Sequence, residues 1–127
     1  MYAKAINRIA AGSTKAMLQN QVRILQLPDD HWMRREAASK QVIGGAIYAA
    51  GVGKPNPAMD AAQNRIETTR AATLDAVRWL AYFIYWRANN FKTIFGSMPD
   101  VSVPGFETVR MEFLDDGTCI AEVKIKL

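Results

Sequence analysis

The chain has 127 residues, of which half are hydrophobic and 22% are charged, and its formal net charge at neutral pH is +4. This length suits one domain with its own core, and this apolar content excludes a chain that is disordered throughout. The longest apolar run is far shorter than the roughly 20 residues of a membrane-spanning helix, and the N-terminus lacks the apolar stretch of a secretory signal. We therefore expect no membrane span and no secretion through a signal peptide.

The charges are distributed unevenly along the chain. Residues 1–27 carry four basic and no acidic side chains, whereas residues 101–127 carry three basic and five acidic ones. A basic front and an acidic tail can attract nucleic acid, or can attract each other in neighbouring copies, although a solvated helix face is the commoner meaning of such a pattern. The possible nucleic-acid or anion contacts are Lys4, Arg8, Lys15 and Arg23.

Two helices are predicted before the first clear loop. Residues 2–27 show helical spacing of apolar side chains, and Pro28 ends this helix because its ring disfavours α geometry at the preceding residue. Ser13 could alternatively cap a separate second helix. The next helix is expected at about residues 30–50, with Asp29 or Asp30 as its N-cap and Gly51 as its C-cap. Within it, the pair Gly44-Gly45 costs about 1 kcal/mol per glycine, which suggests a kink or the close approach of another backbone.

The central element is a long helix that carries two of the three Trp and two of the four Tyr residues. Asn56 as N-cap and Pro57 at the first helical position predict its start, and its end is expected at about residue 88 or 95. Its first half is polar, and the residues able to pack there are Met59, Ala62, Ile66, Ala72 and Leu74. In its second half, four aromatic residues recur at i, i+3, i+4 and i+7 and therefore line one helical face: Trp79, Tyr82, Phe83 and Trp86. A helix this apolar is normally buried on several sides, either within the chain or against a neighbouring subunit.

A linker rich in glycine and proline, residues 96–105, precedes a predicted β-hairpin over residues 106–127. Two loop lengths are conceivable at Asp115-Asp116-Gly117, and only the three-residue loop keeps apolar residues on one face. That register pairs Phe113 with Cys119, Met111 with Ala121 and Val109 with Val123, and it places Arg110 opposite Glu122 on the other face. It also puts Gly117 in the left-handed conformation of a G1 bulge.

A lone hairpin is marginally stable in water, so this one must lie on the helices or join strands of another chain. Residues 123–127 resemble an edge strand with its lysines on the exposed face. The resulting fold class is mainly α (α+β), with three or four helices, a long central helix and a C-terminal β-hairpin. The helical body is expected at 1–95, followed by the linker at 96–105 and the hairpin at 106–127.

Catalytic and metal-binding patterns are absent from the sequence. The single histidine, His31, lies beside two aspartates, a pattern that is more typical of a capped helix start than of a metal site. Cys119 falls on the apolar face of the alternating strand, which predicts a buried thiol. Gly51-Val52-Gly53-Lys54 is no P-loop, because Tyr48 and Pro55 stand where that motif needs glycine and serine or threonine. Asp60, Glu67 and Asp75 have arginines nearby and favour surface ion pairs over acid–base chemistry. We expect no enzyme activity, cofactor or metal.

Three observations lead to a functional hypothesis. The central helix is longer than we expect a chain of this size to bury, the hairpin needs a partner, and the charge is polarised between the ends. They favour a non-enzymatic structural or assembly subunit of a larger oligomeric complex, with a phage virion head–tail or tail adaptor as the specific guess and a virion or cytoplasmic location. Expected partners are copies of the chain and other protein subunits, and the alternative is a nucleic-acid-binding module using the basic N-terminal helix. The expected interface residues are Trp79, Tyr82, Phe83, Trp86, Val123, Ile125 and Leu127.

Overall fold

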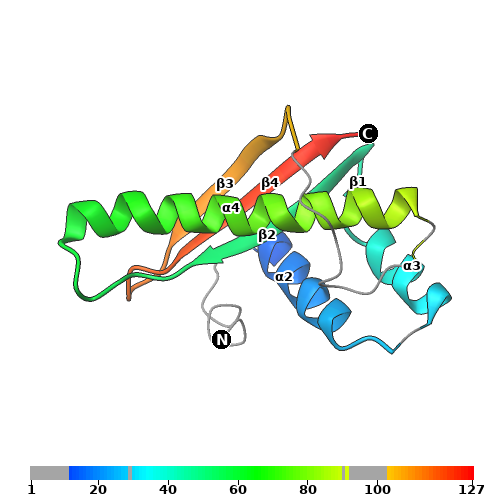
Figure 1. Ribbon diagram of the computed structural model, residues 1–127, viewed down its shortest axis with the longest axis horizontal. Helices are drawn as coiled ribbons and strands as arrows, with labels where there is room; N and C mark the ends of the chain where they lie inside the picture. Colours follow the sequence, from blue (N-terminus) through cyan, green and yellow to red (C-terminus); the bar gives the residue numbers. More distant parts are fainter. Residues whose placement is uncertain (1–11, 29, 90, 92–102) are drawn as a thin grey trace.

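The computed structural model describes residues 12–28, 30–89, 91 and 103–127. This part of the chain combines three helices with one four-stranded antiparallel sheet, and Figure 1 shows the longest helix lying across the sheet. The elements in chain order are α2 (Gly12–Leu25), α3 (His31–Ser39), β1 (Val42–Ile43), β2 (Ala46–Gly53), α4 (Ala61–Ala88), β3 (Glu107–Phe113) and β4 (Cys119–Lys126). The predicted combination of helices, one of them long, with a C-terminal antiparallel strand pair is confirmed.

The sheet has the strand order β1-β2-β4-β3. The last strand of the chain therefore lies inside the sheet, paired along its whole length with β2 from Ala46 opposite Lys126 to Gly53 opposite Cys119. The prediction of an edge strand at residues 123–127 is wrong. The hairpin pairs with a third strand of the same chain, and not with a strand of a neighbouring subunit, the other possibility that the sequence allows.

The hairpin itself follows the predicted register at its turn. Phe113 lies opposite Cys119, Met111 opposite Ala121 and Arg110 opposite Glu122. Gly117 has a φ of 89°, the left-handed conformation that the three-residue loop requires. The pairing rule that kept apolar residues on one face therefore selected the correct loop length.

One pair of the hairpin was predicted wrongly. A bulge between Thr108 and Arg110 shifts the register, so that Thr108 takes the place opposite Val123 that was expected for Val109. A bulge adds one residue to one strand, which cross-strand pairing rules applied to sequence do not reveal. The regular part of β3 next to the turn is Arg110–Phe113.

Residues 30–50 do not form one helix. α3 begins after the N-cap Asp30, whose carboxylate accepts a hydrogen bond from the Met33 amide at 3.0 Å, and it ends at Ser39. Gly44 and Gly45 have φ values of 57° and 77° and form the two-residue turn between β1 and β2. Two successive left-handed residues suit a tight hairpin, and glycine adopts them without a Cβ penalty. The expected role of Gly51 as a helix C-cap is also wrong, since it lies in β2.

α4 starts later than predicted. Its N-cap is Asp60, whose carboxylate accepts from the Gln63 amide at 2.8 Å, whereas Asn56 forms a separate turn in which its side chain accepts from the Ala58 amide. The helix ends at Ala88, the nearer of the two predicted ends. At 28 residues it spans about 42 Å, enough to cross the whole sheet.

α4 and β2 cross at very short range. A Cβ atom added to Gly51 or Gly53 would collide with the α4 backbone, at Ala76 and Ala72 for the first and at Thr68 and Ala72 for the second. Small residues therefore stand on both sides of the crossing, and the helix sits almost directly on the strand. The close backbone approach expected at Gly44-Gly45 therefore occurs at Gly51 and Gly53 instead.

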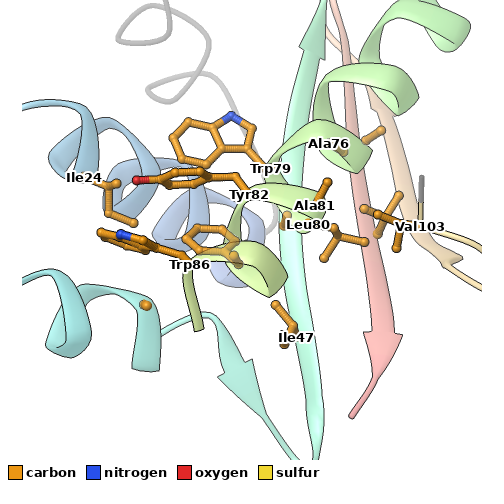
Figure 2. Packing of buried hydrophobic residues seen from close by; sticks show 14 of the residues in the cluster. Ile24, Ile47, Ala76, Trp79, Leu80, Ala81, Tyr82, Trp86 and Val103 are labelled. Atoms are coloured by element: carbon orange, nitrogen blue, oxygen red, sulfur yellow. The ribbon is translucent and has the colours of Figure 1, made fainter. Parts of the chain in front are cut away.

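The aromatic face of α4 is buried within the chain. Trp79, Tyr82, Phe83 and Trp86 expose 1–4% of their surface, and the Tyr82 and Trp86 rings stack with centroids 5.0 Å apart. Figure 2 shows Trp79, Tyr82 and Trp86 layered beside Ile24 of α2. The prediction that these four side chains form a subunit interface is wrong, because α2, α3 and β2 already cover them.

Candidate functional site

The β2 edge of the sheet is closed by groups of the same chain. Beside the short β1, the Tyr48 amide donates to the Gln41 carbonyl at 2.7 Å. Where β1 has ended, the side-chain amide of Gln21 takes the place of a neighbouring strand: its Oε1 accepts from the Ala50 amide at 2.8 Å and its Nε2 donates to the Ala50 carbonyl at 2.7 Å. Further along, the Val52 amide donates to the Asp75 carboxylate at 3.0 Å. No further strand can be added here without displacing these groups.

Buried polar side chains hold α2 against this edge. Asn20 Nδ2 donates to the side-chain oxygen of Gln41 at 2.7 Å and to the Ala37 carbonyl at 2.8 Å. Thr14, near the start of α2, donates to the buried Glu122 carboxylate at 2.7 Å. Because buried polar groups must be hydrogen-bonded, these contacts fix how α2 wraps the sheet and give the polar residues a structural task.

The opposite edge of the sheet is open in the part of the chain that the structure describes. β3 is the terminal strand there, and its residues Glu107–Arg110 are exposed while Met111–Phe113 are half-buried. Met111 and Phe113 pack toward α4, whereas Arg110 faces the α2 side and donates to the Thr14 hydroxyl at 3.2 Å. A terminal strand presents unpaired backbone donors and acceptors, which makes it a template for pairing with another strand.

An open apolar groove runs beside this edge. It has a volume of about 870 Å³ and lies between α4 and Phe106, the residue that leads into β3. Ile66 and Leu74 remain 58% and 51% exposed, and Phe106 remains 36% exposed. The groove-lining residues of α4 recur at helical spacing: Ala62, Arg65, Ile66, Thr69, Arg70, Thr73, Leu74 and Val77.

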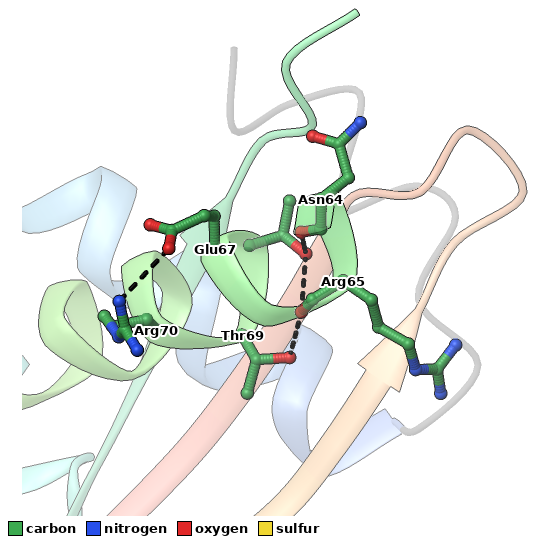
Figure 3. Close-up of polar contacts among 6 residues, drawn as sticks. Asn64, Arg65, Glu67, Thr69 and Arg70 are labelled. Carbon is green, nitrogen blue, oxygen red and sulfur yellow. Dashed lines mark hydrogen bonds and ion pairs between the residues drawn. The ribbon is translucent and has the colours of Figure 1, made fainter. Parts of the chain in front are cut away.

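Two arginines frame the groove. The Arg65 guanidinium lies 4.1 Å from the centroid of the Phe113 ring and so ties α4 to the end of β3. Figure 3 shows Arg65 reaching toward the strand while Arg70 turns to Glu67, with which it forms an exposed ion pair at 3.1 Å. We name the combination of β3 and this groove the β3–α4 surface.

The other predicted interface residues lie in β4 or directly after it: Val123, Ile125 and Leu127. Val123 is fully buried in the core and Ile125 is half-buried against it, so neither offers a free apolar face. Leu127 is 58% exposed, and its amide donates to the Gly45 carbonyl at 2.9 Å. The assignment of Val123 to an interface is wrong because β4 is an inner strand.

The basic N-terminal segment is only partly described. Lys15 is half-buried and Arg23 is exposed, both on α2, while Lys4 and Arg8 lie outside the described residues. The nucleic-acid-binding alternative therefore stays a prediction.

The titratable groups with shifted pKa values belong to the core. Burial raises the pKa of the Cys119 thiol, against smaller opposing effects of the Thr69 hydrogen bond and the Arg65 charge. Burial likewise raises the pKa of Tyr82 to about 12, with Arg34 acting in the opposite direction. Both shifts favour the neutral, unreactive form of the group, as expected for packing residues.

Neither a metal-binding group nor a membrane span is found over the described ranges. Among these residues, no three or more His, Cys, Asp or Glu side chains cluster in a way that could hold a metal ion. No helix within the same ranges is sufficiently long and apolar to cross a membrane.

Comparison with known proteins gives no match to a protein-family model, to a curated protein or to a solved structure. The β3–α4 surface is therefore the feature of this molecule from which a function can be inferred. Sequence reasoning had noted Ile66 and Leu74 as residues able to pack in the polar half of the central helix, but it did not find Phe106. The signal available was the helical spacing of apolar residues in an otherwise polar segment.

Proposed function

We propose that the chain is a non-enzymatic structural subunit that assembles with copies of itself through the β3–α4 surface. The observation that carries the proposal is the coincidence of an open sheet edge with an apolar groove on one side of the molecule. Each feature alone is common on a monomer, but together they offer backbone pairing and apolar burial to the same partner.

The contrast between the two sheet edges supports this proposal. On the β2 side, Gln21 and Asp75 occupy the backbone groups that an added strand would need. On the β3 side, the described residues supply no such cover, and exposed apolar side chains adjoin the strand. Natural proteins protect the sheet edges that they do not use, so the edge left open is the better candidate for a functional contact.

Two features that favour assembly in the sequence do not favour it in the structure. The aromatic block and the hairpin are covered within the chain, so they no longer support a subunit role. The proposal now depends on β3, Ile66, Leu74 and Phe106. The narrower hypothesis, a phage head–tail or tail adaptor that also contacts other protein subunits, remains a sequence-based proposal within this class.

The test is the solution mass of the chain, measured by sedimentation from low-micromolar to sub-millimolar concentration. We expect the wild type to associate and the double variant Ile66→Gln, Leu74→Gln to associate at least about tenfold more weakly, because both side chains would lose apolar burial. Leu25→Gln is the matched control, since Leu25 is 44% exposed on α2, away from the groove. A wild type that remains a single chain throughout this range would refute the proposal.

A further inference from the structure

The β3 strand carries a charge pattern that is complementary to itself. Arg110 and Glu112 are two residues apart and therefore share one face of the strand, while Met111 and Phe113 point to the other face, toward α4. When a strand pairs with an antiparallel copy of itself about a two-fold axis, the register decides which of these residues meet. The possible registers can therefore be compared.

Only one central register brings opposite charges together. Pairing centred on Arg110 sets Arg110 against Arg110, and pairing centred on Glu112 sets Glu112 against Glu112. Pairing centred on Met111 sets Arg110 opposite Glu112 twice, once on each side of the axis. A slip of one residue would place Met111 opposite a charged side chain and mix the two faces of the sheet.

We infer that β3 pairs with β3 of a second copy of this chain, antiparallel and centred on Met111, with each Arg110 opposite Glu112 of the other copy. This inference rests on the proposed function and names the partner and the geometry of the same surface. The joint would turn two four-stranded sheets into one continuous sheet of eight strands, with both α4 helices on the same side.

The bulge in β3 is compatible with this pairing. It lies between Thr108 and Arg110, at the end of the strand away from the turn, and the register with β4 is regular from Arg110 to Phe113. The Leu114 amide donates to the Thr118 carbonyl at 2.8 Å, and antiparallel bonding alternates from there. The backbone groups of Phe113 and Met111 therefore point away from β4, where a second copy can reach them.

The groove supplies the apolar contact that a two-strand joint lacks. A stable interface buries more than a strand edge alone can offer. On the α4 side of the joint, Met111 and Phe113 of the second copy would enter beside β3, next to the exposed Ile66, Leu74 and Phe106. The same strand that aligns the charges on the α2 side thus brings apolar side chains to the groove.

The inference is tested with Glu112→Arg, which sets like charges against each other at both ends of the joint. We expect its dissociation constant to rise roughly ten- to a hundredfold over the wild type, with Glu112→Gln in between. Added salt should weaken the association of the wild type, because it screens the attraction between Arg110 and Glu112. It should strengthen the association of Glu112→Arg, because it screens the repulsion. Glu36→Arg, an equal charge change at an exposed site of α3, should keep the wild-type affinity and salt response.

The outcomes separate this inference from the proposed function. Sedimentation gives the dissociation constants, and thermal unfolding confirms that each variant is folded. If the wild type associates while Glu112→Arg matches it in affinity and salt response, β3 pairing in this register is refuted and assembly stands. Should Glu112→Arg fail to fold, the neutral Glu112→Gln must still weaken association and reduce its salt dependence, or the inference is wrong. A wild type that does not associate at any concentration would refute both the β3 pairing and the proposed function.

Discussion

Gly51 of β2 lies so close to Ala76 of α4 that a Cβ atom on Gly51 would stand 2.9 Å from the Ala76 α-carbon and closer still to its amide nitrogen. The obstacle is backbone, so it cannot move aside as a flexible side chain could. The helix can cross the sheet at this height only because β2 has glycine at two of its α4-facing positions.

Replacement of Gly51 by alanine should therefore destabilise the fold. We expect Gly51→Ala to lower the free energy of unfolding by about 3 kcal/mol, since α4 must shift away from the sheet and loosen the core around it. Gly12→Ala is the control, because a Cβ at Gly12 in α2 meets nothing within 4 Å and should leave stability equal or slightly higher. Urea denaturation of both variants measures the difference, and equal stabilities would contradict the crossing described above.

Because the buried side chain of Gln21 closes the β2 edge, its removal should lower the stability of the fold strongly. Gln21→Ala leaves the buried amide and carbonyl of Ala50 without their partner, which should cost about 2–4 kcal/mol. Gln19→Ala, in the same helix but exposed, should change stability by less than about 0.5 kcal/mol. Chemical denaturation distinguishes the two, and a Gln21→Ala protein as stable as Gln19→Ala would show that the edge is not closed in this way.

The thiol of Cys119 should be protected in the folded protein. It is fully buried and its pKa is raised by burial, so the reactive thiolate is scarce at neutral pH. We expect negligible modification by an aromatic disulfide reagent in buffer and complete modification in denaturant. Because this is the chain's only cysteine, all thiol modification that is measured can be assigned to it. Rapid reaction under native conditions would contradict the buried position of β4.

Tyr82 should make stability depend on alkaline pH. Its pKa is raised from 10.0 to about 12 in the folded state, so the unfolded chain ionises first and releases its proton earlier. The stabilising contribution is therefore complete below about pH 10 and is lost as pH rises toward 12, with a slope of up to about 1.4 kcal/mol per pH unit. Tyr82→Phe keeps the ring and removes the titration. Denaturation of both proteins between pH 9 and about 11.5 should show the steeper decline in the wild type, and parallel curves would contradict the raised pKa.

The sequence predicts the C-terminal hairpin well because its apolar and charged residues alternate. The alternation at Met111, Phe113, Cys119 and Ala121 leaves one loop length that keeps the two faces apart, and the structure has that loop. The aromatic face of α4 was predicted for a similar reason, since helical spacing is a local property. Whether that face is covered from within depends on α2 and α3, which local spacing cannot tell.

β2 was missed because it lacks alternation. Its residues Ala46–Gly53 are nearly all small or apolar and are covered on both sides, by α4 on one face and by α2 on the other. A strand buried on both faces gives no two-residue period, and a run rich in alanine favours helix on propensity alone. The Gly44-Gly45 pair between β-branched and apolar residues was the available hairpin signal.

The candidate surface was only half predictable for a related reason. Ile66 and Leu74 stand out in a polar helical segment, but Phe106 joins them only through the fold, because it lies 40 residues after Ile66 and 32 after Leu74 in the chain. The open edge of β3 depends on the strand order, which followed from β2. With β2 unassigned, the sequence analysis placed the edge at residues 123–127, on the wrong strand of the hairpin.

Amide hydrogen exchange of β3 is the most direct measurement of how this molecule meets its copies. The amides of Met111 and Phe113 should exchange quickly in dilute solution, where the strand is terminal, and should become protected as concentration rises and a second strand covers them. The amide of Ala50, bonded to Gln21, serves as an internal reference that stays protected throughout. Exchange at Met111 and Phe113 that is unaffected by concentration, in samples whose mass shows association, would contradict contact through β3.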